Sequence, residues 1–302
     1  MAEQTTPAVQ TANKVEKPID KLNRFLGADS VKKQFDKALG KHSDIFTTSI
    51  VNLFNSDDKL QQCDPGSLIK ECLAAASMNL PISKSLGFSY IVPFNNTIKD
   101  EKGNKIGTKL VPQFILGYKG YIQLAQRTGQ YKVINADVVY EGELLGTDKL
   151  TGRVNLGGEK KSNKIVGYFA HFELLNGCSH TLYMSVRQMA EYAKAKSKGI
   201  SYKTSVDQLE SLANNPPAFA KVGWEGDFNA MGVKTCLRRL LSKWGFLSIE
   251  MQTQIEKEFD AESVEEPTDT KKDIAVDVAF EEVVAEATAD NGGAQNTDQP
   301  DF

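Results

Sequence analysis

The sequence has few cysteines and lacks any long apolar run, and both absences exclude classes of protein. Its 302 residues contain four cysteines, which are widely spaced and form no Cys-x-x-Cys pair. Reduced, mostly buried thiols are therefore expected in place of disulfides. No apolar segment is long enough to span a bilayer, and the first residues lack the basic and then apolar pattern of a secretory signal. We expect a cytoplasmic protein that does not contact membranes.

Patterns typical of catalysis and metal binding are also missing. The sequence has no G-x-x-x-x-G-K-[ST] phosphate-binding loop, so a nucleotide-driven motor is not expected. His171, Cys178 and His180 have no evident fourth partner for a zinc ion. The acids that a magnesium-dependent nuclease would use are sparse, and the candidates are Asp137, Glu141, Glu143 and Glu159. We expect no catalytic residue, no metal ligand and no required cofactor, with Mg²⁺ only as a counterion.

Positive and negative charge are separated along the chain. Residues 1–249 contain 33 Lys and Arg against 23 Asp and Glu, whereas residues 250–302 contain 3 against 16. The body therefore carries +10 and the last segment −13, which together give the −3 of the whole chain. A basic body favours partners that carry phosphate, and an acidic tail can compete for the same surface or bind another partner.

Acidic residues are absent between Asp227 and Glu250, and this interval contains the most informative segment of the chain. Projected on a helix at about 100° per residue, the segment has an apolar face and a cationic face. The apolar face consists of Ala230, Val233, Cys236, Leu237, Leu240, Leu241 and Trp244, and the cationic face of Lys234, Arg238, Arg239 and Lys243. Solvated helices usually pair cations with nearby acids. The cationic face is predicted to point outward and hold a polyanion, although plain solvated surface has the same pattern.

The chain divides into a flexible N-terminal arm at 1–28, a folded core at 29–250 and an acidic tail at 251–302. Arm and tail are polar and have too little apolar surface to offset the entropy of ordering. The tail is predicted to be disordered, with a transient helix at 273–287, and to bind a partner or regulate the core. Its last residues, 298–302, are similar to the C-terminal tips of bacterial single-strand binding proteins.

The core is predicted to have an α+β fold, with a mainly antiparallel sheet packed against helices and a β-β-α unit within it. Helix starts are indicated at Ser30, Ser43, Asp64-Pro65 and Ser185, and an amphipathic helix at 117–128. Strands are predicted at 88–94, 109–116, 131–140, 165–175 and 180–186, with a hairpin turn at Asn176-Gly177. The connection 95–107 is rich in lysine, as solubilising loops are. The connection 199–217 is long, and loops of that length are often functional.

Three motifs occur in order along the core: Gly87-Phe-Ser-Tyr-Ile-Val-Pro-Phe94, the run from Gln113 to Gln130, and Trp224 followed by Asp227-Phe228, Met231, Lys234-Thr235 and Arg238-Arg239-Leu240. Together they resemble the motifs of the RecT-type phage recombinases, the ATP-independent single-strand annealing proteins. The resemblance covers roughly residues 30–252. It implies an α+β core that assembles into rings or helical filaments, binds single-stranded DNA and anneals complementary strands, in the cytoplasm of a bacterial host. Its implied partners are a 5′-to-3′ exonuclease and the host single-strand binding protein.

The residues carried over as DNA contacts are cationic or amide side chains, which suit annealing. A protein that anneals must hold the sugar-phosphate backbone and leave the base edges free, and phosphate contacts do this without reading sequence. Tyr118, Tyr121 and Trp244 are expected to pack inward, and Trp224 to anchor the late helix to the sheet. The candidate DNA contacts are Lys105, Lys109, Gln113, Lys119, Arg127, Lys221, Lys234, Arg238, Arg239 and Lys243.

One motif leaves an alternative function open. Gly117-Tyr-Lys-Gly120 has the G-x-x-G form of a KH loop, which would indicate a module that binds single-stranded RNA. A KH loop joins two helices, whereas here a predicted strand leads into the motif.

The sequence departs from the family pattern in two places. Trp244-Gly245 stands where some relatives carry a proline, and no shared motif is evident after Glu250.

Overall fold

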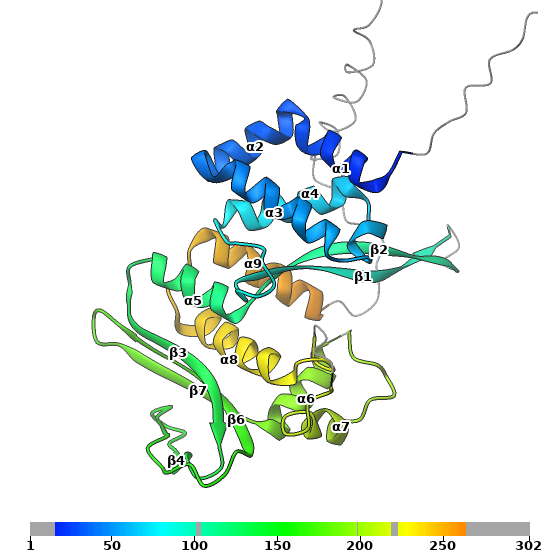
Figure 1. Cartoon of the computed structure of the whole chain (residues 1–302). Coiled ribbons are helices and arrows are strands. Elements are labelled where there is room, and N and C mark those ends of the chain that lie inside the picture. Colours follow the sequence, from blue (N-terminus) through cyan, green and yellow to red (C-terminus); the bar gives the residue numbers. More distant parts are fainter. Residues whose placement is uncertain (1–15, 101–103, 198, 219–222, 264–302) are drawn as a thin grey trace, which may run out of the picture. The chain divides into compact units, whose positions relative to one another are not determined.

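Four helices precede the strands in the described part of the chain (Figure 1). The structure is a computed structural model that describes residues 16–100, 104–197, 199–218 and 223–263, apart from the side chains of Lys99, Lys105 and 259–263. The four helices are α1 (Pro18–Gly27), α2 (Asp29–Leu39), α3 (Ser43–Asn55) and α4 (Pro65–Ser77), with single 3₁₀ turns at Gly40–His42 and Leu60–Gln62. The predicted helices at Ser30, Ser43 and Asp64-Pro65 are confirmed.

The ends of these helices follow the local sequence. Gly40 ends α2 with a φ of 54°, a conformation that favours glycine. At the start of α4 the Asp64 carboxylate accepts a hydrogen bond from the Ser67 amide at 2.9 Å, and Pro65 occupies the first turn. Helix α1 lies within the segment that we predicted to be a flexible arm. Its Leu22 and Leu26 are buried, and this apolar stripe orders residues 18–27 against the other helices.

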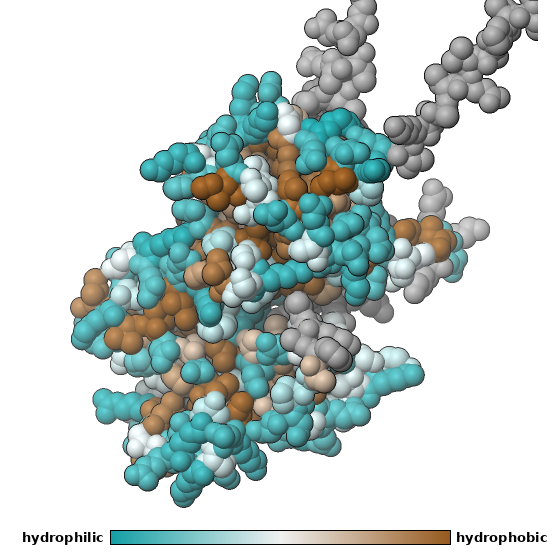
Figure 2. Space-filling view, in the orientation of Figure 1, coloured by the Kyte–Doolittle hydropathy of each residue, from teal (hydrophilic) through white to brown (hydrophobic). Residues whose placement is uncertain are grey.

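A long hairpin follows, formed by β1 (Ser89–Lys99) and β2 (Lys105–Leu116). The strands are antiparallel and place Ser89 opposite Leu116, with an irregularity between Ile98 and Lys99. Both strands are longer than predicted, because the polar residues that we assigned to a connection pair across the hairpin, as Thr97 does with Thr108. An apolar patch marks the end of the hairpin in Figure 2, where Ile98 and Ile106 are exposed.

Helix α5 (Tyr118–Arg127) follows β2 directly and completes the predicted β-β-α unit. A three-stranded antiparallel sheet comes next, in the order β3 (Tyr131–Tyr140), β6 (Ile165–Leu174) and β7 (Ser179–Ser185). The short strands β4 (Gly146–Thr147) and β5 (Val154–Asn155) pair separately. Gly177, with a φ of 83°, makes the predicted turn between β6 and β7. All paired strands in the described residues are antiparallel, which confirms the α+β fold class.

Four further helices complete the described chain, and they are α6 (Val186–Lys196), α7 (Val206–Ser211), α8 (Phe228–Trp244) and α9 (Ile249–Ser263). Ser185 and Ser205 each form a capping box, with Gln188 and Gln208 as the reciprocal partners. Helix α7 interrupts the segment 199–217, which we predicted as a long connection. Helix α9 extends the folded part past Glu250, where we placed the start of the tail. The remaining tail, 264–302 with the predicted helix at 273–287, lies outside the described residues, as do residues 1–15 of the arm.

Helix α8 packs against the three-stranded sheet and forms the centre of the core (Figure 1). Its apolar face behaves as predicted, since Val233, Cys236, Leu237, Leu240 and Leu241 are all buried. Of the four cysteines, Cys63, Cys72 and Cys236 are buried free thiols and Cys178 is exposed. Burial raises the pKa of the Cys236 thiol to about 12, so this thiol stays protonated at neutral pH. No helix in the described chain has the length and apolar character needed to cross a membrane.

Candidate nucleic-acid interface

The cations of α8 do not form the single outward face that the helical projection predicts. Lys234 is 9% exposed and Arg238 is 3% exposed, so the first two are buried. Arg239 is half-buried, and Lys243 is exposed. The prediction that all four point into solvent is therefore wrong for Lys234 and Arg238. The physical reason is α9, whose position could not be read from the α8 sequence and which packs against this side of the helix.

Glu258 of α9 supplies the counter-charge that the sequence around α8 lacks. One carboxylate oxygen accepts a hydrogen bond from Lys234 Nζ at 3.0 Å, and the other lies 3.5 Å from Arg238 Nη1. The Gln254 side chain also donates to Glu258 at 3.4 Å. The carboxylate thus bridges two cations one turn apart on α8. Glu258 lies in the segment that we predicted to be a tail, and the sequence signal for it is only the spacing of Met251, Ile255 and Glu258 along one helical face.

Tyr192 of α6 contacts both arginines of the Arg238-Arg239 pair. Its hydroxyl accepts a hydrogen bond from Arg238 Nη2 at 3.0 Å, and its ring lies 4.8 Å from the Arg239 guanidinium carbon. Arg239 also places Nη1 3.5 Å from the Met184 sulfur. A guanidinium held over an aromatic ring keeps a fixed orientation, which suits repeated contact with a phosphate. Arg239 is the member of the pair that remains accessible from solvent.

The last turn of α8 presents a cation beside an aromatic stack. Lys243 Nζ lies 4.2 Å from the centre of the Trp244 ring, and Trp244 stacks on His180 of β7 with ring centroids 4.9 Å apart. Trp244 is 37% exposed, so our expectation that it packs inward is wrong. It is the last residue of α8, where one face of its ring stacks on His180 and the side chain still reaches solvent. His180, a possible zinc ligand by sequence, is engaged in this stack instead.

On α5 the two predicted contacts have different roles. Lys119 is exposed in the first turn of the helix, with its Cδ beside Gly87. Arg127 donates hydrogen bonds to the carbonyl oxygens of Met78 at 2.6 Å and Asn79 at 2.8 Å, immediately after the end of α4. Cations at a helix C-terminus stabilise it by satisfying free carbonyl groups. Arg127 therefore has a structural function that its outward position in the helical projection did not reveal.

Replacing Arg127 with alanine should lower the free energy of unfolding by about 1.5 kcal/mol, because two charge-assisted hydrogen bonds to the end of α4 are lost. Chemical denaturation measures this change. Gln126→Ala is the matched control, since Gln126 is exposed on the same turn. Equal stability of the two variants would contradict the capping role of Arg127.

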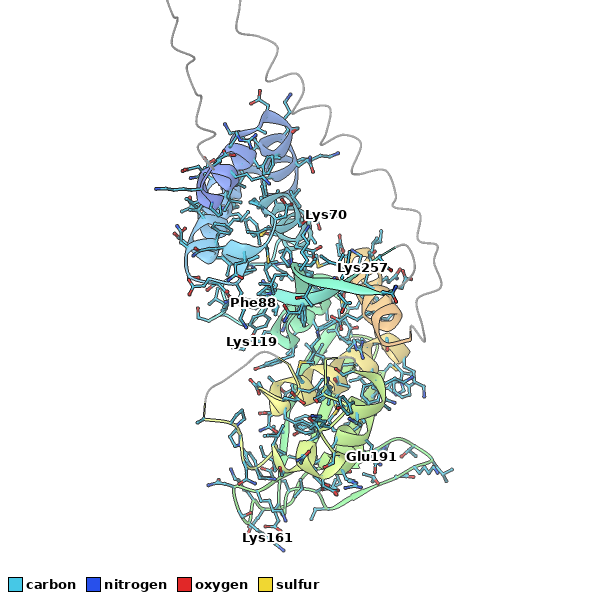
Figure 3. All side chains as sticks on the ribbon, turned by 90° about the vertical axis from the view of Figure 1, so that its right-hand side faces the viewer. Lys70, Phe88, Lys119, Lys161, Glu191 and Lys257 are labelled. Carbon is cyan, nitrogen blue, oxygen red and sulfur yellow. The ribbon has the colours of Figure 1, made fainter. Side chains whose placement is uncertain are left out.

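The hairpin contributes further exposed polar groups. Lys109 and Gln113, both in β2, are exposed as predicted. The Lys105 side chain and the whole of Lys221 lie outside the described residues. Figure 3 shows three exposed lysines on helices around the β1–β2 hairpin, namely Lys70 of α4, Lys119 of α5 and Lys257 of α9. Lys70 and Lys257 were not predicted, because neither belongs to a basic cluster in the sequence.

The G-x-x-G motif has a packing role in this structure. A Cβ on Gly117 would lie 2.2 Å from the Gly87 carbonyl oxygen, and one on Gly120 would lie 2.3 Å from the Phe88 carbonyl oxygen. Both glycines are therefore needed for the chain entering β1 to approach the start of α5. The Gly117 amide also donates to the Phe88 carbonyl at 2.9 Å. The motif follows a strand and does not join two helices, so it does not form a KH loop.

The acids considered for a nuclease are engaged in local hydrogen bonds. Glu143 accepts from the Tyr140 amide at 2.7 Å, Glu141 from the Ser162 hydroxyl at 2.8 Å, and Asp137 from the Val138 amide at 2.8 Å. Within the described residues, no three His, Cys, Asp or Glu side chains converge in a way that would hold a metal ion. The geometry around β3 therefore gives no support to metal-dependent cleavage.

Comparison with known proteins agrees with the motifs on α5 and α8. The model of the RecT family matches residues 44–272, most of the chain. The chain belongs to the RecT family. It is 40% identical over 238 residues to the uncharacterized protein YqaK of Bacillus subtilis strain 168, covering 78% of this chain and 72% of that protein. It is 29% identical over 241 residues to Protein RecT of Escherichia coli K12, covering 76% and 77% of the two chains.

Membership of the RecT family assigns the chain a general role in DNA recombination and single-strand annealing. Several residues of the late RecT motif build α8. Asp227 caps the helix by accepting from the Ala230 amide at 3.0 Å, and Trp224 is buried with its ring 5.4 Å from that of Phe228. Trp224 is thus a buried packing partner of the first turn of α8, and its anchoring of this helix to the sheet stays a prediction. The family match also continues beyond Glu250 through α9, where we recognised no shared motif.

Proposed function

We propose that this RecT-family protein binds single-stranded DNA by its sugar-phosphate backbone and anneals complementary strands without ATP, leaving the base edges free to pair. Family membership is the observation that carries the proposal. The surface chemistry supports it, because exposed cations reach solvent from β2, α5 and α8. A contact set of ammonium, guanidinium and amide groups positions a strand without selecting its sequence.

The proposed contacts are Lys109, Gln113, Lys119, Arg239 and Lys243, all of which reach solvent. Arg127 is also exposed but is left out, because its guanidinium donates to the carbonyl oxygens of Met78 and Asn79. Within the described chain, the ammonium groups of Lys109, Lys119 and Lys243 are not in an ion pair. Unpaired surface ammonium groups recruit counterions, and the release of these counterions drives the binding of nucleic acid. The bases face away from this surface in the proposed complex, so that a second strand can pair.

Oligomerisation is part of the proposed mechanism. The contacts of one subunit cover few nucleotides, so pairing over a useful length requires neighbouring copies to continue the track in a ring or helical filament. A 5′-to-3′ exonuclease that exposes the strand and the host single-strand binding protein are the proposed partners, and annealed duplex is the proposed product. No bond is made or broken, so the proposal requires no catalytic residue and no cofactor, and Mg²⁺ acts only as a counterion.

The direct test is annealing of complementary oligonucleotides in the absence of nucleoside triphosphate. We expect the full-length protein to raise the rate of duplex formation at low salt, with ring or filament assemblies visible by electron microscopy. A parallel assay with RNA strands distinguishes the KH-like alternative, which would show sequence-selective RNA binding. Failure to accelerate DNA annealing at any protein concentration would reject the proposal.

The double substitution Lys119→Ala and Lys243→Ala should weaken binding of oligonucleotides of different sequence to a similar extent. The slope of log K against log salt should become less steep by about 0.7 for each lost phosphate contact. Fluorescence anisotropy over a salt series measures both effects. Lys33→Ala together with Lys37→Ala is the matched control, because both lysines are exposed on α2. An unchanged affinity and slope in the Lys119 and Lys243 variant would remove these residues from the interface.

A further inference from the structure

The contact between α9 and α8 places one carboxylate against two buried cations. Glu258 places one carboxylate oxygen 3.0 Å from Lys234 Nζ and the other 3.5 Å from Arg238 Nη1. A phosphodiester carries the same single negative charge and also offers two oxygens to two adjacent cations. Lys234 and Arg238 are 9% and 3% exposed, so the carboxylate occupies a position from which a strand is excluded while α9 is in place.

We propose that Glu258 mimics a phosphate and that α9 is a displaceable cover over a DNA-phosphate site formed by Lys234, Arg238 and the Tyr192 hydroxyl. This inference rests on the proposed function, because the ligand that replaces Glu258 is a phosphodiester of single-stranded DNA. In this arrangement Lys234 and Arg238 form a second group of DNA contacts, distinct from the exposed lysines. They bind DNA only after α9 leaves, whereas Lys119 and Lys243 bind from the start.

The way α9 is attached supports displacement. Its described buried side chains are Met251, Gln254 and Ile255, which form one narrow stripe next to Glu258. The other face of the helix is solvated, since Ile249 is 79% exposed and Glu256 and Lys257 are exposed. A helix attached by one stripe and one carboxylate can be released without rearranging the sheet or α8. A polyanion that competes for the two cations removes the electrostatic part of this attachment.

Two binding equilibria compete for the same surface of α8, namely the docking of α9 and the binding of DNA. Any change that weakens the docking of α9 must strengthen apparent DNA binding, by at most the same factor, because the two ligands exclude each other. Glu258→Gln removes the charge and keeps the size of the side chain. Glu256→Gln is the matched control, since it removes an equal charge from the exposed side of the same helix. Long-range electrostatic effects on DNA binding are nearly the same in both variants.

We expect full-length Glu258→Gln to bind a fluorescent oligothymidine at least about fivefold more tightly than the wild type at low salt. The slope of its salt dependence should stay close to that of the wild type, because α9 leaves in both proteins and the same phosphates are neutralised. Glu256→Gln should differ little from the wild type in affinity. The inference is overturned if Glu258→Gln binds no more tightly than Glu256→Gln.

A measurement on the wild-type protein covers the case in which Glu258→Gln does not fold. Hydrogen exchange of the α9 amides should become faster when the oligonucleotide is bound, while the α8 amides stay protected. Unchanged or increased protection of α9 in the complex would overturn the cover mechanism and leave the proposed function intact. Absence of any binding by the wild type would instead reject the proposed function, and this inference with it.

Discussion

Replacing Gly120 with alanine should lower the free energy of unfolding by about 3 kcal/mol or more, one of the largest effects of a single methyl group in this chain. The added Cβ would lie 2.3 Å from the Phe88 carbonyl oxygen and 2.6 Å from Leu116 Cδ1. Both neighbours are fixed, because Phe88 enters β1 and the fully buried Leu116 ends β2. Relief of the clash would move α5 away from the hairpin. Chemical denaturation of the two proteins measures the loss.

Gly146→Ala is the control for this experiment. A Cβ on Gly146 would meet no atom within 4 Å, so this substitution tests only the general effect of adding a methyl group. The stability of the variant should stay close to that of the wild type. If Gly120→Ala were as stable as Gly146→Ala, the close approach of the β1 entry to α5 would not be a requirement of the fold. The packing explanation of the G-x-x-G motif would then be wrong.

Arg238→Ala should lower the free energy of unfolding by about 3 kcal/mol or more, since it removes one partner from a buried charged network. The variant loses the contact with the Glu258 carboxylate and the 3.0 Å hydrogen bond to the Tyr192 hydroxyl. It also leaves a cavity beneath α9, because Arg238 is 3% exposed. Urea denaturation followed by circular dichroism is the measurement, with the salt concentration kept constant.

Two other cations of the same helix provide the comparison. Arg239→Ala should cost about 1 kcal/mol, because the half-buried guanidinium loses its position over the Tyr192 ring. Lys243→Ala should change stability by less than about 0.5 kcal/mol, because its side chain is exposed. The expected order of destabilisation is therefore Arg238, then Arg239, then Lys243. Equal effects at the three positions would mean that they share one solvated face, as the helical projection alone predicts.

Much of the fold was predictable from the sequence because its signals are local. Asp64-Pro65 marks the start of α4, Ser185 opens α6 with a capping box, and Gly177 takes the positive φ of the β6–β7 turn. Each of these signals depends on residues within one turn of the chain. The antiparallel pairing of β6 with β7 follows from a hairpin connection of the same local kind, whereas β3 and β6 pair across the long segment 141–164. Errors in the predicted strands lie at their ends, as in the extension of the β1–β2 hairpin, and the short strands β4 and β5 were not predicted.

The candidate site was predicted less well because burial on a helix depends on elements that are distant in the sequence. Periodicity separated the apolar side of α8 from its charged side correctly, but it could not show that Glu258 of α9 binds Lys234 and Arg238 on the charged side. Likewise, Arg127 has the pattern of a solvated cation, yet its partners are carbonyl groups at the end of α4, 48 and 49 residues away. Tertiary partners of this kind leave no local signal.

The contrast between the two tryptophans gives the protein an internal optical probe for each end of α8. Trp224 is 7% exposed beside the first turn of the helix, and Trp244 is 37% exposed at its last turn. Indole emission shifts and is quenched according to the polarity and charge of its immediate surroundings. A DNA strand bound beside Lys243 would therefore change the longer-wavelength emission of the exposed Trp244. The shorter-wavelength emission of the buried Trp224 would stay constant and serve as a reference within the same molecule.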